Sequence, residues 1–307
     1  MSDPRYEEVK ECVLCGEKER KFVFKDGKFS VLRCSSCGLV FVSPRLTQKA
    51  LLEEVYNENY WHSSSPKEKG YADYAGEEML YIKTFRKRIK FIERFTKPFG
   101  KVLDVGCAAG YFLSVAKEKG WECSGIEPSY PIAQIAKKRL PGTKIHIGLV
   151  DDAPFEKESF DVVTLWDVVE HTLNPVSFVK KAVGFLKPGG LLIVETQNVD
   201  SLFARILGKK WQHFKLEEHL YHFSPYTLRI LLEDLAGVRI IRMTSFYGGK
   251  YVSPAFIAER IGRINPVLSK LLSPFSLIKK LGIYVNVYDE LVVAARKGGT
   301  KEEPVHG

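Results

Sequence analysis

Four cysteines near the N-terminus have the residue type and spacing that can hold a metal ion. Cys12 and Cys15 form one Cys-x-x-Cys pair, and Cys34 and Cys37 form a second pair eighteen residues further on. This spacing is typical of a zinc ribbon, and so small a segment lacks a sufficient core without a metal. Because thiolates fill all four positions, no place remains for a reacting water, and we expect structural Zn²⁺. Two disulfides are the alternative, which a cytosolic location disfavours.

A second group of residues with chemical potential is a glycine-rich turn that follows an apolar strand. Its residues alternate as Asp104-x-Gly106-x-Ala108-x-Gly110. A dinucleotide-binding turn would need glycine at the positions of Ala108 and Tyr111 as well, so this turn departs from that fingerprint. An acid at the strand end, followed by small residues at every second position, suits a ligand that carries a cationic amine and lacks a pyrophosphate.

The next predicted strand ends on Glu127, about 20 residues after the glycine turn, where a carboxylate can accept both hydroxyls of a ribose. Acidic residues also end strands because they face water, so neither Asp104 nor Glu127 identifies a ligand by itself. Together, at the ends of adjacent strands, they predict an adenosine-like ligand that bears an amine. S-adenosylmethionine has these features.

Three histidines are candidates for the base that methyl transfer to a hydroxyl or an acidic carbon requires. His171 lies in "VVEHTLNP", and His219 and His222 lie in "EEHLYHFS". Imidazole titrates near neutral pH and is therefore suited to accepting a proton. One alternative is that His171 only shapes its loop and that the other two pack in the interior. Another is that His219 and His222 bind a metal, although no third ligand is evident.

A regular alternation of strands and helices must position these residues. Apolar segments predict strands, and segments of helical periodicity lie between them. The alternation indicates an α/β fold with a doubly wound, mostly parallel, seven-stranded sheet that binds ligands at the carboxyl ends of its strands. We predict strands at 101–106, 121–126, 144–148, 160–166, 190–196, 238–246 and 284–296, and helices at 110–119, 129–139, 174–186 and 224–235. The last helix has a clear start, with Ser224 as N-cap and Pro225 at its first position.

Residues 98–298 resemble the class I S-adenosylmethionine-dependent methyltransferases. The stretch "VLDVGCAAG" is similar to the first motif of that family, and "GIEPS" is similar to its ribose-binding strand end. "DDAPFEKESFDVVTLWDVVEHTLNP" and "FLKPGGLLIVETQN" are similar to the segments around its fourth and fifth strands. "EEHLYHFSPYTLRILLEDLAG" is similar to a later segment of a bacterial subfamily that often carries an N-terminal zinc-binding module. The resemblance implies a Rossmann-like methyltransferase fold and an enzyme.

The resemblance also implies where each part of the methyl donor binds. It places the methionine part at the glycine turn, the ribose at Glu127, and the sulfonium at the end of the fourth strand. At the adenine loop this chain has Leu149 where many relatives have an acid, so the adenine contact falls to Asp151 or Asp152. The implied donor-binding residues are Asp104, Gly106, Cys107, Gly110, Glu127, Pro128, Asp152, Ala153, Trp166 and Asp167.

The cysteine pairs and the resemblance together divide the chain into parts. We expect a zinc-ribbon module at 1–45, a helical linker or cap at 46–97, a methyltransferase domain at 98–298 with a helical insertion at about 250–282, and a flexible tail at 299–307. Two amphipathic segments are candidates for shaping the acceptor pocket. Segment 201–214 can form a lid, and the basic segment 254–282 either contacts an anionic membrane or packs as a cap.

The composition favours a cytoplasmic globular enzyme. The 307-residue chain carries a net charge of +9 and has no apolar run near the roughly 20 residues that span a bilayer. Its polar N-terminus is not a secretory signal. The basic residues are scattered, and we interpret their densest stretch, 83–90, as the solvated face of a helix.

Three functions are compatible with these patterns. We expect methyl transfer from S-adenosylmethionine to an oxygen or carbon of a sugar, a quinone-like compound or a lipid-linked acceptor. The first alternative is an RNA methyltransferase that grips phosphates with its zinc ribbon. The second alternative is a binding or scaffold protein that has the fold without turnover. The acceptor, the methylated atom and the oligomeric state stay open at this point.

Overall fold

The computed structural model describes residues 3–55, 77–97, 99–264 and 282–298. Its centre is a seven-stranded sheet in the order β12-β15-β10-β9-β6-β7-β8. All of these strands are parallel except β15, which is antiparallel to both of its neighbours. The predicted doubly wound, mostly parallel sheet is therefore confirmed. The strands are β6 (Lys101–Val105), β7 (Glu122–Glu127), β8 (Lys144–Ile147), β9 (Phe160–Trp166), β10 (Leu186–Gln197), β12 (Val238–Thr244) and β15 (Glu290–Lys297).

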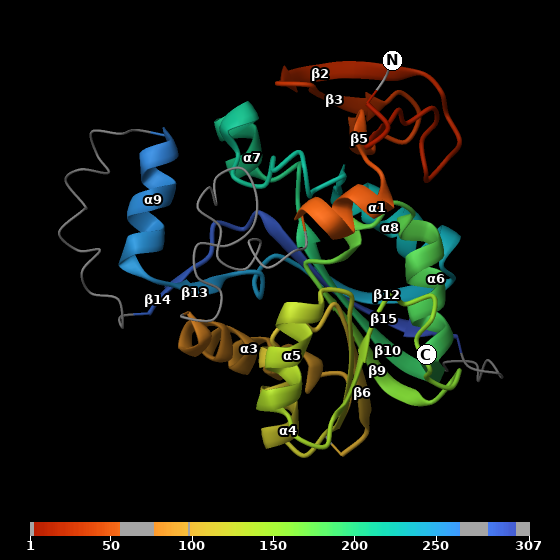
Figure 1. Cartoon of the computed structure of the whole chain (residues 1–307), viewed down its shortest axis with the longest axis vertical. Helices are drawn as coiled ribbons and strands as arrows, with labels where there is room; N and C mark the ends of the chain where they lie inside the picture. The colour runs from red at the N-terminus through yellow and green to blue at the C-terminus, as the bar shows by residue number, and fades with distance from the viewer. Residues whose placement is uncertain (1–2, 56–76, 98, 265–281, 299–307) are drawn as a thin grey trace, which may run out of the picture.

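Helices cover both faces of this sheet, with α3, α4 and α5 on one face and α6 and α8 on the other (Figure 1). The central strand β9 is consequently almost entirely buried and apolar, as its sequence "FDVVTLW" requires for a strand enclosed by helices. The helices are α3 (Glu78–Ile92), α4 (Tyr111–Glu118), α5 (Tyr130–Arg139), α6 (Pro175–Phe185) and α8 (Pro225–Arg229). This double cover leaves the carboxyl ends of the strands as the edge where a ligand can enter.

Local capping fixes where the helices that follow the candidate histidines begin. The Asn174 side chain caps α6 by accepting a hydrogen bond from the Ser177 amide. At α8, the Ser224 side chain accepts from the Thr227 amide while Thr227 bonds back to the Ser224 amide, which is a capping box. The helix continues through a π-helical turn, η4 (Ile230–Leu235). The predicted helical segment 224–235 is therefore α-helical in its first half and π-helical in its second half.

The predicted strand at 284–296 is wrong, because two strands occupy this region. β14 (Ile283–Val285) ends before a turn, and β15 begins at Glu290. Asn286 forms the turn by donating to the carbonyls of Ser245 and Phe246, and its side-chain oxygen accepts from the amide of Tyr288. A left-handed Tyr288, with φ of 59°, completes the reversal of direction.

The predicted insertion at about 250–282 begins as a strand. β13 (Lys250–Val252) pairs with β14, and α9 (Pro254–Ile264) follows it. Residues 265–281 lie outside the described residues, as does the predicted tail at 299–307, so the choice between membrane contact and cap for 254–282 stays a prediction. Every helix within the described ranges is too short or too polar to span a membrane.

The N-terminal segment forms a small sheet that includes a strand from the main domain. Its strand order is β11-β4-β3-β2, and it lies at the top of Figure 1. β2 (Arg20–Asp26), β3 (Phe29–Cys34) and β4 (Val40–Ser43) belong to the N-terminal segment, whereas β11 is Tyr221–His222. A second pairing joins β1 (Tyr6–Glu7) to β5 (Arg45–Leu46). The segment is therefore integrated with the domain through shared backbone hydrogen bonds.

The described part of the predicted linker is helical. It contains a single helical turn, α1 (Gln48–Ala50), a π-helical turn, η1 (Leu51–Val55), and the long helix α3. One side of α3 buries Leu80, Phe85, Ile89 and Ile92 against the domain, which gives the helix its amphipathic character. Residues 56–76 of the linker lie outside the described residues.

Candidate functional site

A cavity of about 1010 Å³ lies at the carboxyl ends of the central strands. It brings together most of the residues that the sequence analysis singled out for the donor and the acceptor. The predicted residues that line it are Asp104, Gly106, Cys107, Glu127, Pro128, Trp166, Asp167, His171 and His219. Gly110, Asp152, Ala153 and His222 are not part of its lining.

The glycine turn between β6 and α4 forms one wall of the cavity. Its backbone is left-handed at Gly106 and Gly110, with φ of 81° and 74°. A side chain at Gly106 would come within 2.6 Å of Val168, so glycine allows this turn to lie against the segment that follows β9. A side chain at Gly110 would instead meet Leu140, at 2.8 Å. Gly110 therefore serves helix packing, which explains why it does not line the cavity.

Two buried carboxyl groups, Asp104 and Glu127, line the cavity. Asp104 accepts a hydrogen bond of 2.6 Å from the hydroxyl of Thr164 on β9. Glu127 accepts hydrogen bonds from the amides of Ala108 and Ser129, at 2.9 and 2.8 Å. Burial raises the pKa of Asp104 and of Glu127 to about 7. Both groups can therefore change charge near neutral pH when a ligand replaces water around them.

Of the two candidate acids in the loop after β8, Asp151 lines the cavity and also pairs with Lys181 of α6. Asp151 lines the cavity together with Gly148, Leu149 and Val150. The carboxylate of Asp152 is largely exposed and lies 3.4 Å from Nε2 of His146. Asp152 and Ala153 do not line the cavity, so their predicted contact with the adenine stays a prediction.

A charge network borders the cavity where β9 ends; Arg88, Glu195 and Glu290 are buried in it, and Asp167 and Lys250 are partly exposed. The ammonium of Lys250 lies 2.9 Å from Asp167 and 2.7 Å from Glu290. The guanidinium of Arg88 pairs with Glu195 and lies 3.7 Å from Glu290. Burial opposes the ionisation of Asp167, but the charges of Lys250 and Arg88 outweigh burial and lower its pKa. The predicted solvated face at 83–90 is thus wrong for Arg88, which is buried because it neutralises these acids.

His171 and His219 meet at the cavity although they are 48 residues apart. Their rings are perpendicular, with centroids 4.7 Å apart. Nδ1 of His219 donates to the carbonyl of His213 at 2.8 Å, which leaves Nε2 as the basic nitrogen of the neutral ring. Burial lowers the pKa of both histidines, and the neighbouring His171 and Lys215 lower that of His219 further. Burial therefore favours the neutral form of both rings.

His222, the third predicted base, lies in the interior instead. Its ring is fully buried, packs against Phe214 with centroids 4.7 Å apart, and lies 3.3 Å from the amide of Gln197. Burial lowers the pKa of His222 to about 3. Because β11 turns this side chain away from the cavity, His222 is no longer a candidate for contact with an acceptor.

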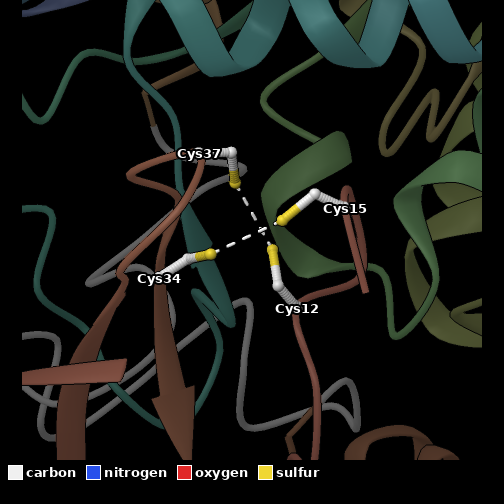
Figure 2. A group of neighbouring side chains, drawn as sticks. All are labelled: Cys12, Cys15, Cys34 and Cys37. Atoms are coloured by element: carbon white, nitrogen blue, oxygen red, sulfur yellow. Dashed lines mark hydrogen bonds between the residues drawn. The ribbon is translucent and has the colours of Figure 1, made fainter. Parts of the chain in front are cut away.

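The four N-terminal cysteines converge on one point, as Figure 2 shows. Their sulfur atoms all lie within 4.8 Å of one another, and the Cys12–Cys37 and Cys15–Cys34 pairs are 3.5 Å apart. A tetrahedral zinc site with Zn–S bonds of about 2.3 Å places its sulfurs about 3.8 Å apart. The cluster therefore has dimensions that fit a zinc ion. The other two cysteines, Cys107 and Cys123, are buried separately, and burial raises the pKa of both.

Two further groups of side chains among the described residues are compact enough to share an ion. Glu170, His171 and His219 offer ligand atoms within 4.8 Å of one another at the cavity. Burial raises the pKa of Glu170 well above its ordinary value. The second group consists of the three acids of the charge network, which already pair with Arg88 and Lys250.

Comparison with known proteins adds to this geometry. A family model described as a methyltransferase domain matches residues 79–241, more than half of the chain. The chain belongs to this methyltransferase family. The match confirms the predicted class I S-adenosylmethionine-dependent methyltransferase, because it spans the glycine turn and the strands β6 to β10 on which that prediction rests.

The methyltransferase is also similar to curated proteins over part of its length. It is 31% identical over 122 residues to the ubiquinone biosynthesis O-methyltransferase of Bradyrhizobium diazoefficiens, a match that covers 38% of this chain but only 43% of that protein. It is 24% identical over 170 residues to the protein of the same name from Coxiella burnetii, covering 52% of this chain and 73% of that protein.

A solved structure shares the fold of the methyltransferase. It is a chain from the Haloferax volcanii complex between the Trm112 methyltransferase activator and a methyltransferase. The TM-score is 0.51 at 16% sequence identity, and the match covers 73% of this chain and 95% of the other. At this level of identity the comparison speaks for the fold alone.

Several residues of the site were missed by sequence reasoning. Lys250, Glu290 and Arg88 line the cavity but come from segments with no recognisable motif. Glu195 gave a signal, because it is a charged residue inside the apolar strand "LLIVETQ" and a buried charge requires a partner. The identity of that partner, on α3, follows only from the tertiary structure.

Proposed function

We propose that this methyltransferase binds S-adenosylmethionine at the Glu127 end of the cavity and transfers its methyl group to a hydroxyl oxygen of a small, quinone-like acceptor at the histidine end. The observation that carries the proposal is the cavity itself, which has buried carboxyl groups on one side and His171 with His219 on the other. The names of the curated relatives favour a quinone-like acceptor over a sugar.

On the donor side, each part of the ligand has a suited partner. Glu127 can accept the ribose hydroxyls, since its two oxygens now bond only backbone amides among the described contacts. Asp151, which pairs with Lys181, would receive the adenine amine, and Asp104 would attract the cationic amine of the methionine part. Trp166 and Asp167 would lie beside the sulfonium, with the Asp167 charge shared with Lys250.

On the acceptor side, a neutral histidine removes the hydroxyl proton. The acceptor oxygen forms a bond to the methyl carbon, the carbon–sulfur bond breaks with its electron pair moving to sulfur, and the proton goes to the imidazole. His219 offers Nε2 for this purpose because its Nδ1 is committed to the His213 carbonyl. His171 is the second candidate. The protein contributes positioning and proton removal, while the donor supplies the electrophilic methyl group.

The walls of the cavity suit an aromatic acceptor. Apolar side chains from α6, α7 (Leu202–Leu207) and α9 contribute to the lining, among them Phe178, Phe203, Leu207 and Phe256. A flat ring can bury its faces against such side chains while its hydroxyl reaches a histidine. The position of α7 at the cavity supports the lid prediction for 201–214 and makes that lid part of this proposal.

The test is an acceptor panel with isotope-labelled methyl donor. The purified protein is incubated with a hydroquinone, a catechol, a nucleotide-linked hexose and total tRNA, and products are identified by mass spectrometry. We expect a labelled methyl ether of the hydroquinone or the catechol. Label in tRNA or in the hexose, with none in the aromatic acceptors, would contradict the proposed acceptor class.

We also propose that residues 1–45 form a zinc ribbon whose ion is structural. The four sulfurs would fill the coordination sphere and leave no position for a reactant, so the ion stabilises the module. Purified protein should contain about one Zn²⁺ per chain. A Cys15→Ser variant should lose the metal and melt at a lower temperature. Full zinc content in that variant would contradict a four-cysteine site.

A further inference from the structure

The N-terminal module is joined to the loops that carry the two cavity histidines. β4 of the module pairs with β11, which begins two residues after His219. The amide of Val42 in β4 donates to the carbonyl of Leu220 at 3.0 Å, and the amide of Leu220 donates to the carbonyl of Glu170 at 2.9 Å. A continuous line of backbone hydrogen bonds thus runs from the module to the residue before His171.

Arg45, at the end of the module, adds side-chain hydrogen bonds beside this line. We call the group formed by Arg45, the Tyr221 hydroxyl and the Leu173 carbonyl the clamp. Nη1 of Arg45 donates to the hydroxyl of Tyr221 at 2.6 Å and to the carbonyl of Leu173 at 3.1 Å. The hydroxyl of Tyr221 in turn donates to the same carbonyl at 3.0 Å. Tyr221 follows His219 by two residues, and Leu173 follows His171 by two residues. The three groups therefore form a triangle that ties the two histidine loops together.

The module holds the guanidinium in place from its other side. Nε of Arg45 donates to Glu7 at 2.8 Å, and the backbones of these two residues pair between β1 and β5. Only 14% of the Arg45 side chain is exposed, and Tyr221 is buried. Arginine suits this position because its rigid fork reaches several acceptors at once, which the single ammonium of lysine does not reproduce.

We infer that Arg45 is a positioning residue, which fixes His171 and His219 relative to each other through Tyr221 and the Leu173 carbonyl. Arg45 does not line the cavity, so it acts through these neighbours rather than on a ligand. The inference rests on the proposed function in that it assigns the histidine pair to the acceptor step. It gives the N-terminal module a role at the site beyond its own stability.

Two variants test this role, and a third serves as a matched control. Arg45→Gln removes the clamp, and Tyr221→Phe removes one hydroxyl while the ring still packs. The control is Arg33→Gln, because Arg33 also joins the module to the domain, through Asp200 at 3.7 Å, but its described hydrogen bonds and ion pairs involve neither Tyr221 nor Leu173. Zinc content and melting temperature, measured for all three, identify any variant that does not fold.

In turnover assays with the hydroquinone or catechol that the acceptor panel identifies, we expect kcat to fall about 10- to 100-fold in Arg45→Gln, because a small misplacement of reacting groups is costly. Tyr221→Phe should show a smaller loss. The dissociation constant of S-adenosylmethionine should stay unchanged in both variants, and Arg33→Gln should match the wild type throughout. A wild-type kcat in folded Arg45→Gln would overturn the inference.

The pH profile separates positioning from general stability. Water that enters a loosened site raises the lowered pKa values of His219 and His171 towards the ordinary value. The acid limb of kcat should therefore move to higher pH in Arg45→Gln and stay in place in Arg33→Gln. The groups that act on His171 from its surroundings, and that remain unaltered in these variants, are Asp167, Glu170, Lys215, Glu218 and His219. An unmoved acid limb in Arg45→Gln would count against the clamp.

A measurement without any acceptor keeps this inference separate from the proposed function. Diethyl pyrocarbonate modifies accessible neutral imidazoles, and peptide mass spectrometry reports the rate at each histidine. Faster modification of His171 and His219 in Arg45→Gln and Tyr221→Phe, with His146 as internal reference, supports the clamp even if no acceptor reacts. Equal rates in wild type and both variants would refute the clamp. Failure of the proposed function would instead appear as a wild type that methylates none of the aromatic acceptors.

Discussion

The donor half and the acceptor half of the cavity are built in different ways. The donor half comes from one continuous stretch, in which the ends of β6 and β7 and the loop after β8 supply Asp104, Glu127 and Asp151. The acceptor half combines segments far apart in the chain, including His171, His219 and the strand that contains Lys250. The first half follows from local strand–turn–helix units, whereas the second depends on long-range packing and on the N-terminal module.

The largest effect that separates the halves is expected from replacing the histidine that acts as the base, for which His219→Gln and His171→Gln are both measured. Loss of a general base lowers kcat by about 10²- to 10⁴-fold. Because both histidines belong to the acceptor half, the affinity for S-adenosylmethionine measured by calorimetry should not change. His146→Gln is the control, since that histidine pairs with Asp152 away from the cavity. If His171→Gln has wild-type turnover while His219→Gln has lost it, the base is His219; wild-type turnover in both would remove the histidines from the chemistry.

A smaller effect, on donor affinity and not on the base, is expected from Glu127→Ala. Removing the partner of buried polar groups should weaken donor binding by about 1–3 kcal/mol. Glu122→Ala, on the same strand but with an exposed side chain, is the matched control and should bind the donor normally. Calorimetric titration with S-adenosylmethionine measures both. Equal affinities in the two variants would show that the ribose does not bind at Glu127.

The smallest effect is the pH dependence of donor affinity. With a pKa of about 7, Glu127 is mostly protonated at pH 6 and mostly ionised at pH 8, and the ionised form accepts ribose hydroxyls better. Donor affinity should therefore rise about tenfold between these values.

The same raised pKa affects the stability of the ligand-free protein. Its stability falls as the pH rises from about 4.5 through 7, because the folded state disfavours the charged carboxyl of Glu127. Thermal melting with and without donor measures both trends; donor affinity that is flat with pH would exclude this linkage.

The features that could be predicted from the sequence are local ones, and those that could not depend on contacts between distant segments. The strand–helix alternation, the Ser224 cap and the cysteine pairs could be predicted because each depends on residues close together in the chain. The pairing of Arg88 with Glu195 and the interior position of His222 could not, since both depend on how distant segments pack. A motif such as "EEHLYHFS" shows that histidines cluster, but only the register of β11 against β4 decides which of them faces the cavity.

The measurement that tests the central claim most directly is a crystal structure of the protein with S-adenosylhomocysteine, the product of the donor. We predict that the ribose hydroxyls contact Glu127, that the adenine lies beside Asp151, and that the sulfur points towards Trp166 and the His171–His219 pair. Product bound elsewhere, or a cavity in which Glu127 and Asp104 make no contact with it, would contradict the account.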